Sequence, residues 1–182
     1  MRLLNFLLGK EKSANSNLAI TLHDPNKPLT EDNLIKWHFD ELLKTLITLS
    51  SPADRQAEIM GFGNANSEMV EDFVWHYIET KDDLTTELIL IEPQTIVLDN
   101  ITKLIDKHSG KPEDNFWNPE QLKTHSDWTT IRKIATEVLI LLGKDNLQLK
   151  IETTNEYDKS DKGEKLIIQR QKIYLINNEK KQ

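Results

Sequence analysis

Apolar residues recur at helical spacing from residue 31 to residue 49, and this is the clearest pattern in the chain. A recurrence every three or four positions places one apolar face along a helix. Thr30 precedes the run as a suitable N-cap, and Glu31 and Asp32 match the positive end of the helix dipole. We therefore expect a first helix from about 31 to 49. Its apolar face comprises Leu34, Ile35, Phe39, Leu42, Leu43, Leu46 and Leu49.

Four further helices are indicated by caps and periodicity together. Asn118 and Pro119 form an additional helix-start signal, with Gln121 able to reach back to the cap. The apolar stretch 85–92 is compatible with either a strand or a continued helix. The four helices are bounded by Pro52 at a first helical position and Gly61 as a stop, by Asn66 or Ser67 as a start, by Pro93 as a start and Gly110 beyond the end, and by Ser126 or Asp127 as a start and Gly143 beyond the end.

Alternating apolar and polar residues, typical of half-buried strands, occur near both ends of the chain. Residues 18–22 alternate before a turn at Pro25 and Pro28, and residues 147–151 alternate after the last helix. A turn signal at 158–163 then lets residues 164–176 pair back as a hairpin. That last segment also fits a helix, but its isoleucine and tyrosine content favours a strand.

These elements predict a single α+β domain that is predominantly α-helical, with about five helices and a small antiparallel sheet from the N- and C-terminal segments. The expected organisation is an N-terminal arm at 1–16, a strand and turn at 17–30, a helical core at 31–143, a β-hairpin at 144–176 and a tail at 177–182.

Composition fits a soluble globular protein, because 37% of the 182 residues are hydrophobic and 29% are charged. The chain has no cysteine, which excludes disulfides, thiol nucleophiles and cysteine-ligated metals. The apolar run at 3–8 is too short and too interrupted for a secretory signal, and no stretch approaches the length of a membrane-spanning helix. We expect a cytoplasmic protein that does not bind membranes.

The net charge of −7 is unevenly distributed along the chain. Residues 1–30 carry +2, residues 31–142 carry −11 and residues 143–182 carry +2. An acidic field disfavours nucleic acid and attracts a basic protein partner. A mildly acidic surface that serves only solubility would give the same pattern.

Two Trp-His pairs, Trp37-His38 and Trp75-His76, each precede a glutamate by three residues. On a helical wheel both tryptophans fall outside the apolar faces, although each ring could still pack under a loop or the terminal strands. Large aromatics among acidic residues match the anchors and rim of a protein interface. The predicted partner-binding surface comprises Trp37, Asp40, Glu41, Glu68, Glu71, Asp72, Trp75 and Glu79.

An alternative interpretation is a metal-dependent enzyme or small-ligand protein, because Asp72, His76 and Glu79 share one helix face. Its ligands would be His38, Glu41, Asp72, His76 and Glu79. The di-iron and HExxH spacings are absent, and so are the glycine-rich nucleotide motifs and the nucleophile elbow. We therefore expect no enzyme activity, no catalytic residue and no cofactor. His125 and Asp127 are interpreted as capping residues, and His108 as a helix C-terminal residue.

The stretches 53–77 and 115–143 resemble a group of small bacterial proteins, some of them similar to immunity proteins of polymorphic-toxin and contact-dependent inhibition systems. The resemblance rests on the spacing of apolar, tryptophan and glycine positions. It implies a cytoplasmic protein that binds one cognate toxin, and the acidic charge leads us to expect a basic one. A homo-oligomeric structural subunit, such as a homodimer that uses the same tryptophans, is a further alternative.

Overall fold

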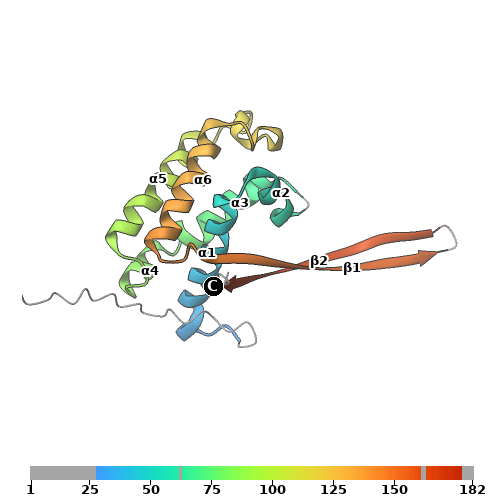
Figure 1. Ribbon diagram of the computed structural model, residues 1–182, viewed down its shortest axis with the longest axis horizontal. Helices are drawn as coiled ribbons and strands as arrows, with labels where there is room; N and C mark the ends of the chain where they lie inside the picture. Colours follow the sequence, from blue (N-terminus) through green and yellow to red (C-terminus); the bar gives the residue numbers. More distant parts are fainter. Residues whose placement is uncertain (1–27, 62, 161–162, 178–182) are drawn as a thin grey trace, which may run out of the picture.

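The computed structural model describes residues 28–61, 63–160 and 163–177, and Figure 1 shows a helical body from which a long β-hairpin projects. Within these ranges the fold is predominantly helical α+β with one two-stranded antiparallel sheet, so the predicted fold class is confirmed. The elements are α1 (Glu31–Ser50), α2 (Ala53–Met60), α3 (Ala65–Phe73), the π turn η1 (Val74–Ile78), α4 (Lys81–Thr86), α5 (Glu92–His108), the 3-10 turns η2 (Asn115–Trp117) and η3 (Pro119–Gln121), α6 (Ser126–Leu141), β1 (Leu147–Ser160) and β2 (Gly163–Asn177).

Helix α1 lies at the centre of the body, in contact with α2, α3, α4, α6, η1 and both strands. Its residues from Phe39 to Leu49 are therefore buried with few exceptions, including polar residues that a one-sided helix would expose. The buried hydroxyls of Thr45 and Thr48 donate to the backbone oxygens of Glu41 and Lys44, so they lie in the core with their hydrogen bonds made. The sequence predicts one covered face for this helix, whereas neighbouring elements cover most of its circumference between Phe39 and Leu49.

Helices α5 and α6 form an antiparallel pair beside α1 (Figure 1). The side chain of Gln94, near the start of α5, donates to the backbone oxygen of Leu141 at the end of α6. At the other end of the pair, His108 of α5 contacts Asp127 of α6. The segment η2–η3 closes this second end.

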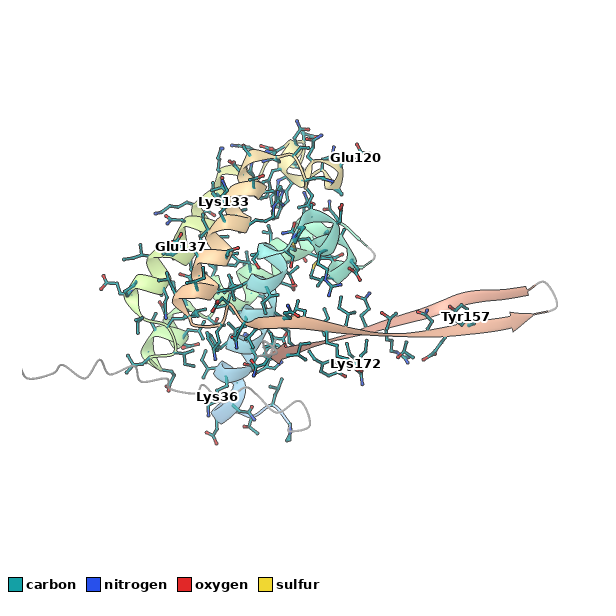
Figure 2. All side chains as sticks on the ribbon, in the orientation of Figure 1. Lys36, Glu120, Lys133, Glu137, Tyr157 and Lys172 are labelled. Carbon is teal, nitrogen blue, oxygen red and sulfur yellow. The ribbon has the colours of Figure 1, made fainter. Side chains whose placement is uncertain are left out.

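Strands β1 and β2 pair from Leu147 opposite Asn177 to Ser160 opposite Gly163, with one irregularity after Glu156. The end nearest the helices contributes to the core through residues such as Leu149, Ile151 and Ile173. The distal half extends away from the body, and Figure 2 shows Tyr157 on this projecting part. Strand β2 confirms the strand interpretation of residues 164–176. The strand predicted within 17–30 falls on 1–27, outside the described residues.

Several predicted boundaries differ from the observed ones in informative ways. Helix α2 begins at Ala53, so Pro52 is its N-cap rather than its first residue. Asn118 does cap the following turn, but Pro119 opens only the 3-10 turn η3. The ambiguous stretch 85–92 is neither a strand nor one helix: it spans the end of α4, a turn and the start of α5.

That turn contains Leu88, a non-glycine residue at a φ of +54°. A left-handed backbone breaks the helix, and the apolar pattern alone does not reveal such a break. Among the described residues, no helix is long and apolar enough to cross a membrane.

Candidate functional site

The candidate site lies where α3 continues into the π turn η1. Asn64 caps α3 through its side-chain oxygen, which accepts hydrogen bonds from the backbone N–H groups of Asn66 and Ser67. Asn66 is fully buried and donates to the backbone oxygen of Phe116 at 2.7 Å, which holds the helix to the segment before α6. The first turn of α3 is thus held by a cap on its backbone and by the side chain of Asn66, which joins it to the core.

The end of the site is fixed by Tyr77. Its ring is buried, and its hydroxyl donates to the carboxylate of Asp99 on α5 at 2.7 Å. Lys81 donates to the same carboxylate at 2.7 Å. Phe73, His76 and Tyr77 are buried on the side of the helix that faces the core. Trp75 therefore points away from the core, and 60% of its surface is exposed. The helical-wheel prediction for Trp75 is confirmed.

Trp75 borders a groove of about 620 Å³ on this helix. We call it the Trp75 groove, and it is lined by Val70, Glu71, Asp72, Val74, Trp75 and Glu79. The ion pairs and hydrogen bonds between described side chains leave the carboxylates of Glu71, Asp72 and Glu79, and of nearby Glu68, without a cationic partner. An exposed indole thus lies among negative charges that the described residues do not neutralise.

The pKa of Asp72 is affected by this negative charge. Burial raises the pKa of its carboxyl to about 6, and repulsion from Glu41, Glu68 and Glu71 contributes in the same direction. A positive charge brought to the groove would relieve that repulsion.

Behind the groove, His38 of α1 and His76 of η1 are in contact through their Nδ1 atoms, 3.2 Å apart. The ring centroids are 5.4 Å apart, so the two nitrogens face each other nearly head-on. Burial, then His38 and Lys44, lower the pKa of His76 to about 4. Burial also lowers the pKa of His38, against the opposing effect of Asp83 and Glu41. Two neutral rings can share one proton in such a contact.

A small cavity of about 80 Å³ adjoins the histidine pair. Glu41, Asp72 and His76 line it together with Lys44, which is paired with Glu41 at 2.7 Å. Glu79 lines the Trp75 groove instead. Of the five residues of the metal interpretation, three line this cavity, His38 lines neither space, and Glu79 is separated from the cavity. Within the described ranges, no group of three or more His, Asp or Glu residues is placed to hold a metal ion.

Two residues of the predicted partner surface lie elsewhere than expected. Asp40 is buried, because it falls beside Leu43 and Ile47 on a face of α1 that its neighbours cover, so it lies apart from the exposed surface around Trp75. Trp37 is half-buried, with its ring edge-on to His38 and His76 at centroid distances of 4.9 and 5.3 Å. Trp37 therefore supports the histidine pair.

A second polar cluster was not anticipated from the sequence. His108 is buried, with Nδ1 2.9 Å from Asp114 and Nε2 2.7 Å from Asp127. Both contacts are hydrogen bonds only when both ring nitrogens carry protons. The ring stacks on Phe116 at 4.2 Å, and Phe116 stacks in turn on Trp128.

This cluster has the features of a structural joint. Lys107 also donates to Asp127, and this bond, followed by that of His108, lowers the pKa of the Asp127 carboxyl. The backbone N–H of Phe116, followed by His108, lowers the pKa of Asp114. His125 is the N-cap of α6, as predicted. The sequence marks His108 and His125 as helix-end residues, but it contains no signal that pairs His108 with carboxylates 6 and 19 positions away.

Comparison with known proteins adds no assignment to this geometry. No family model, no curated protein and no solved structure matches the chain. The Trp75 groove is therefore the basis on which a function can be proposed.

Proposed function

We propose that this chain is a non-enzymatic protein-binding protein that holds a basic protein partner at the Trp75 groove. In its most concrete form, it is an immunity protein that neutralises a cognate bacterial toxin in the cytoplasm. The observation that supports the proposal is the 60% exposure of Trp75 among carboxylates that have no cationic partner in the described part of the chain.

An exposed tryptophan leaves a large apolar area in contact with water, and a bound partner removes that area from water. An indole carries a large apolar area, and tryptophan is enriched among the residues that dominate binding energy at interfaces. Val74 and Ile78 extend the apolar surface next to it, and Glu71 and Glu79 lie at its rim. An apolar centre with a charged rim is the arrangement that a protein partner covers.

The carboxylates give the surface a preferred partner. A cluster of uncompensated negative charge accelerates the approach of a basic protein and disfavours acidic ones. Because Tyr77 and Asn66 fix the helix to the core, little conformational entropy is lost when a partner binds. These features support rapid binding to a basic target.

The two alternative functions have less support. The cavity beside His76, at about 80 Å³, is smaller than the roughly 300–1,000 Å³ of typical ligand pockets. A two-fold homodimer through the Trp75 groove would place Glu71 and Glu79 of one copy close to the same carboxylates of the other. Charge repulsion therefore opposes that form of self-association.

The proposal is tested by affinity purification of the tagged protein from its native cell at low and at high salt, with mass spectrometry of the eluate. Trp75→Ala is purified in parallel, with Ile140→Ala as the control, since Ile140 on α6 is 59% exposed. The expected result is a stoichiometric basic protein that is retained by the native chain and by Ile140→Ala, weakened by salt and lost from Trp75→Ala. Equal retention by Trp75→Ala, or no partner at either salt, would contradict the proposal.

A further inference from the structure

The Trp75 groove carries a repeating arrangement of charge and aromatic surface. Glu71, Trp75 and Glu79 follow one another at four-residue intervals, and all three line the same groove. They follow one another along α3 and the π turn η1, with Trp75 between the two glutamates. The indole is therefore flanked by a carboxylate on either side.

The indole is also available for contact. Among the described residues, no aromatic ring and no cation lies against Trp75, whereas Trp37, Trp117 and Trp128 all contact other rings. Lys44, the basic residue nearest to Asp72 in the lining of the inner cavity, is paired with Glu41. A flat aromatic face and two carboxylates remain open on the groove side.

The lining is apolar as well as acidic. Val70 and Val74 belong to it, so a ligand that fits must combine an aliphatic segment with a positive group. Arginine and lysine both satisfy this requirement. They differ in the head group, because guanidinium is planar, weakly hydrated and able to donate to two carboxylates while stacked on an aromatic ring.

We propose that the Trp75 groove binds an arginine side chain of the partner, with its guanidinium on the indole of Trp75 between Glu71 and Glu79 and its aliphatic stem along Val74. This assignment rests on the proposed function and specifies the chemistry that the partner must present. Lysine is a poorer ligand here, since its ammonium is strongly hydrated and makes no planar stack.

Asp72 supplies a further charge at the inner side of the groove. It lines both the groove and the cavity beside His76, and Glu41, Glu68 and Glu71 all act on it electrostatically. A guanidinium bound between Glu71 and Glu79 lowers the repulsion among these carboxylates. A neutral ligand of identical shape leaves that repulsion in place and gains nothing from it.

The test uses three hexapeptides of alternating glycine and a second residue, which is arginine, lysine or citrulline. Citrulline has the shape of arginine without its charge. Each peptide is titrated into the full chain at low salt, and the indole N–H signal of Trp75 is followed by NMR, with Trp75→Phe used to assign it. The matched variants are Glu71→Gln/Glu79→Gln and, as the control, Glu137→Gln on α6, which Figure 2 labels.

We expect the arginine peptide to bind at least about fivefold more tightly than the lysine peptide, and the citrulline peptide not to shift the Trp75 signal. The double variant should lose the preference, and Glu137→Gln should keep it. Equal affinities for arginine and lysine, no shift with any peptide, or an unchanged preference in the double variant would overturn the assignment. If any of these three results is obtained while capture of the protein partner still requires Trp75, only the arginine assignment fails. A partner that binds Trp75→Ala normally refutes the proposed function itself.

Discussion

The Nδ1 atoms of His38 and His76 lie 3.2 Å apart, and this contact joins the central helix α1 to the π turn that carries Trp75. Since the two nitrogens face each other, one proton between them satisfies both, whereas protons on both Nδ1 atoms would set two N–H groups against each other. The pair therefore fixes the position of the turn only while one of the two Nδ1 atoms is unprotonated.

The first prediction concerns the protonation of this pair. His76 should remain neutral as the pH falls through 6 and take up a proton only near its lowered pKa of about 4. NMR titration of the imidazole carbon-bound protons measures this directly. Titration of His76 near its ordinary value of 6.5 would show that the ring is not held as described.

The second prediction concerns Asp72, whose pKa is shifted in the opposite direction. Because its folded pKa of about 6 exceeds the ordinary 3.8, the folded state is penalised increasingly as the pH rises from 3.8 to about 6, and the penalty persists above that. Asp72→Asn should stabilise the chain by about 1–2 kcal/mol at pH 8, after partial exposure is taken into account, and by little below pH 4. Thermal unfolding at the two pH values gives the comparison. A gain of equal size at both would mean that ionisation of Asp72 is not the cause.

The third prediction concerns the buried amide of Asn66. Asn66→Ala removes the donor to the backbone oxygen of Phe116 and leaves a cavity beneath α3, so a loss of about 2–3 kcal/mol is expected. Asn100→Ala is the control, because the side chain of Asn100 accepts a hydrogen bond from the exposed Lys103, and it should change stability by less than about 0.5 kcal/mol. Urea unfolding measures both. Similar values for the two variants would show that Asn66 does not hold the helix in place.

The fourth prediction concerns the joint between α5 and α6. His108→Ala removes the ring stacked on Phe116 and deprives Asp114 and Asp127 of a donor, so it should cost about 3 kcal/mol or more. His125→Ala removes an N-cap and the edge-on ring contacts with His108 and Phe116 but leaves no carboxylate without its donor, so it should cost less, about 1 kcal/mol. Denaturant unfolding of the two variants distinguishes these roles, which would be mistaken if His125→Ala proved the more damaging substitution.

The fifth prediction concerns the projecting hairpin. Replacement of residues 155–169 by Asn-Gly joins the facing residues Thr154 and Arg170 through a two-residue turn and retains the strand ends that pack on the core. The shortened protein should keep its stability within about 1 kcal/mol, whereas Leu149→Ala should lose about 2–4 kcal/mol. Thermal unfolding provides the measure. A body that fails to fold without the distal strands would refute the division between anchored and free halves.

The sequence predicts the helices and the hairpin well, because caps such as Asn118 and the period of α6 are local signals. It also places Trp75 off the apolar face, although it leaves open whether the ring is exposed or covered. It does not indicate the burial of Asp40 or the partial cover of Trp37, because α1 is surrounded by other elements and a helical wheel assumes one covered face. Contacts such as His108 with Asp127 depend on how α5 and α6 meet, which no local pattern specifies.

The central claim is that Trp75 anchors a basic partner, and its most direct test is calorimetric titration of the captured partner with three proteins: the native chain, Trp75→Ala and Ile140→Ala. Loss of an anchor should weaken binding by about 2 kcal/mol or more, which is roughly thirtyfold in Kd, while both variants keep the native unfolding transition. Ile140→Ala, which removes an equally exposed side chain from α6, should bind like the native chain. Native affinity in a folded Trp75→Ala protein would contradict the account.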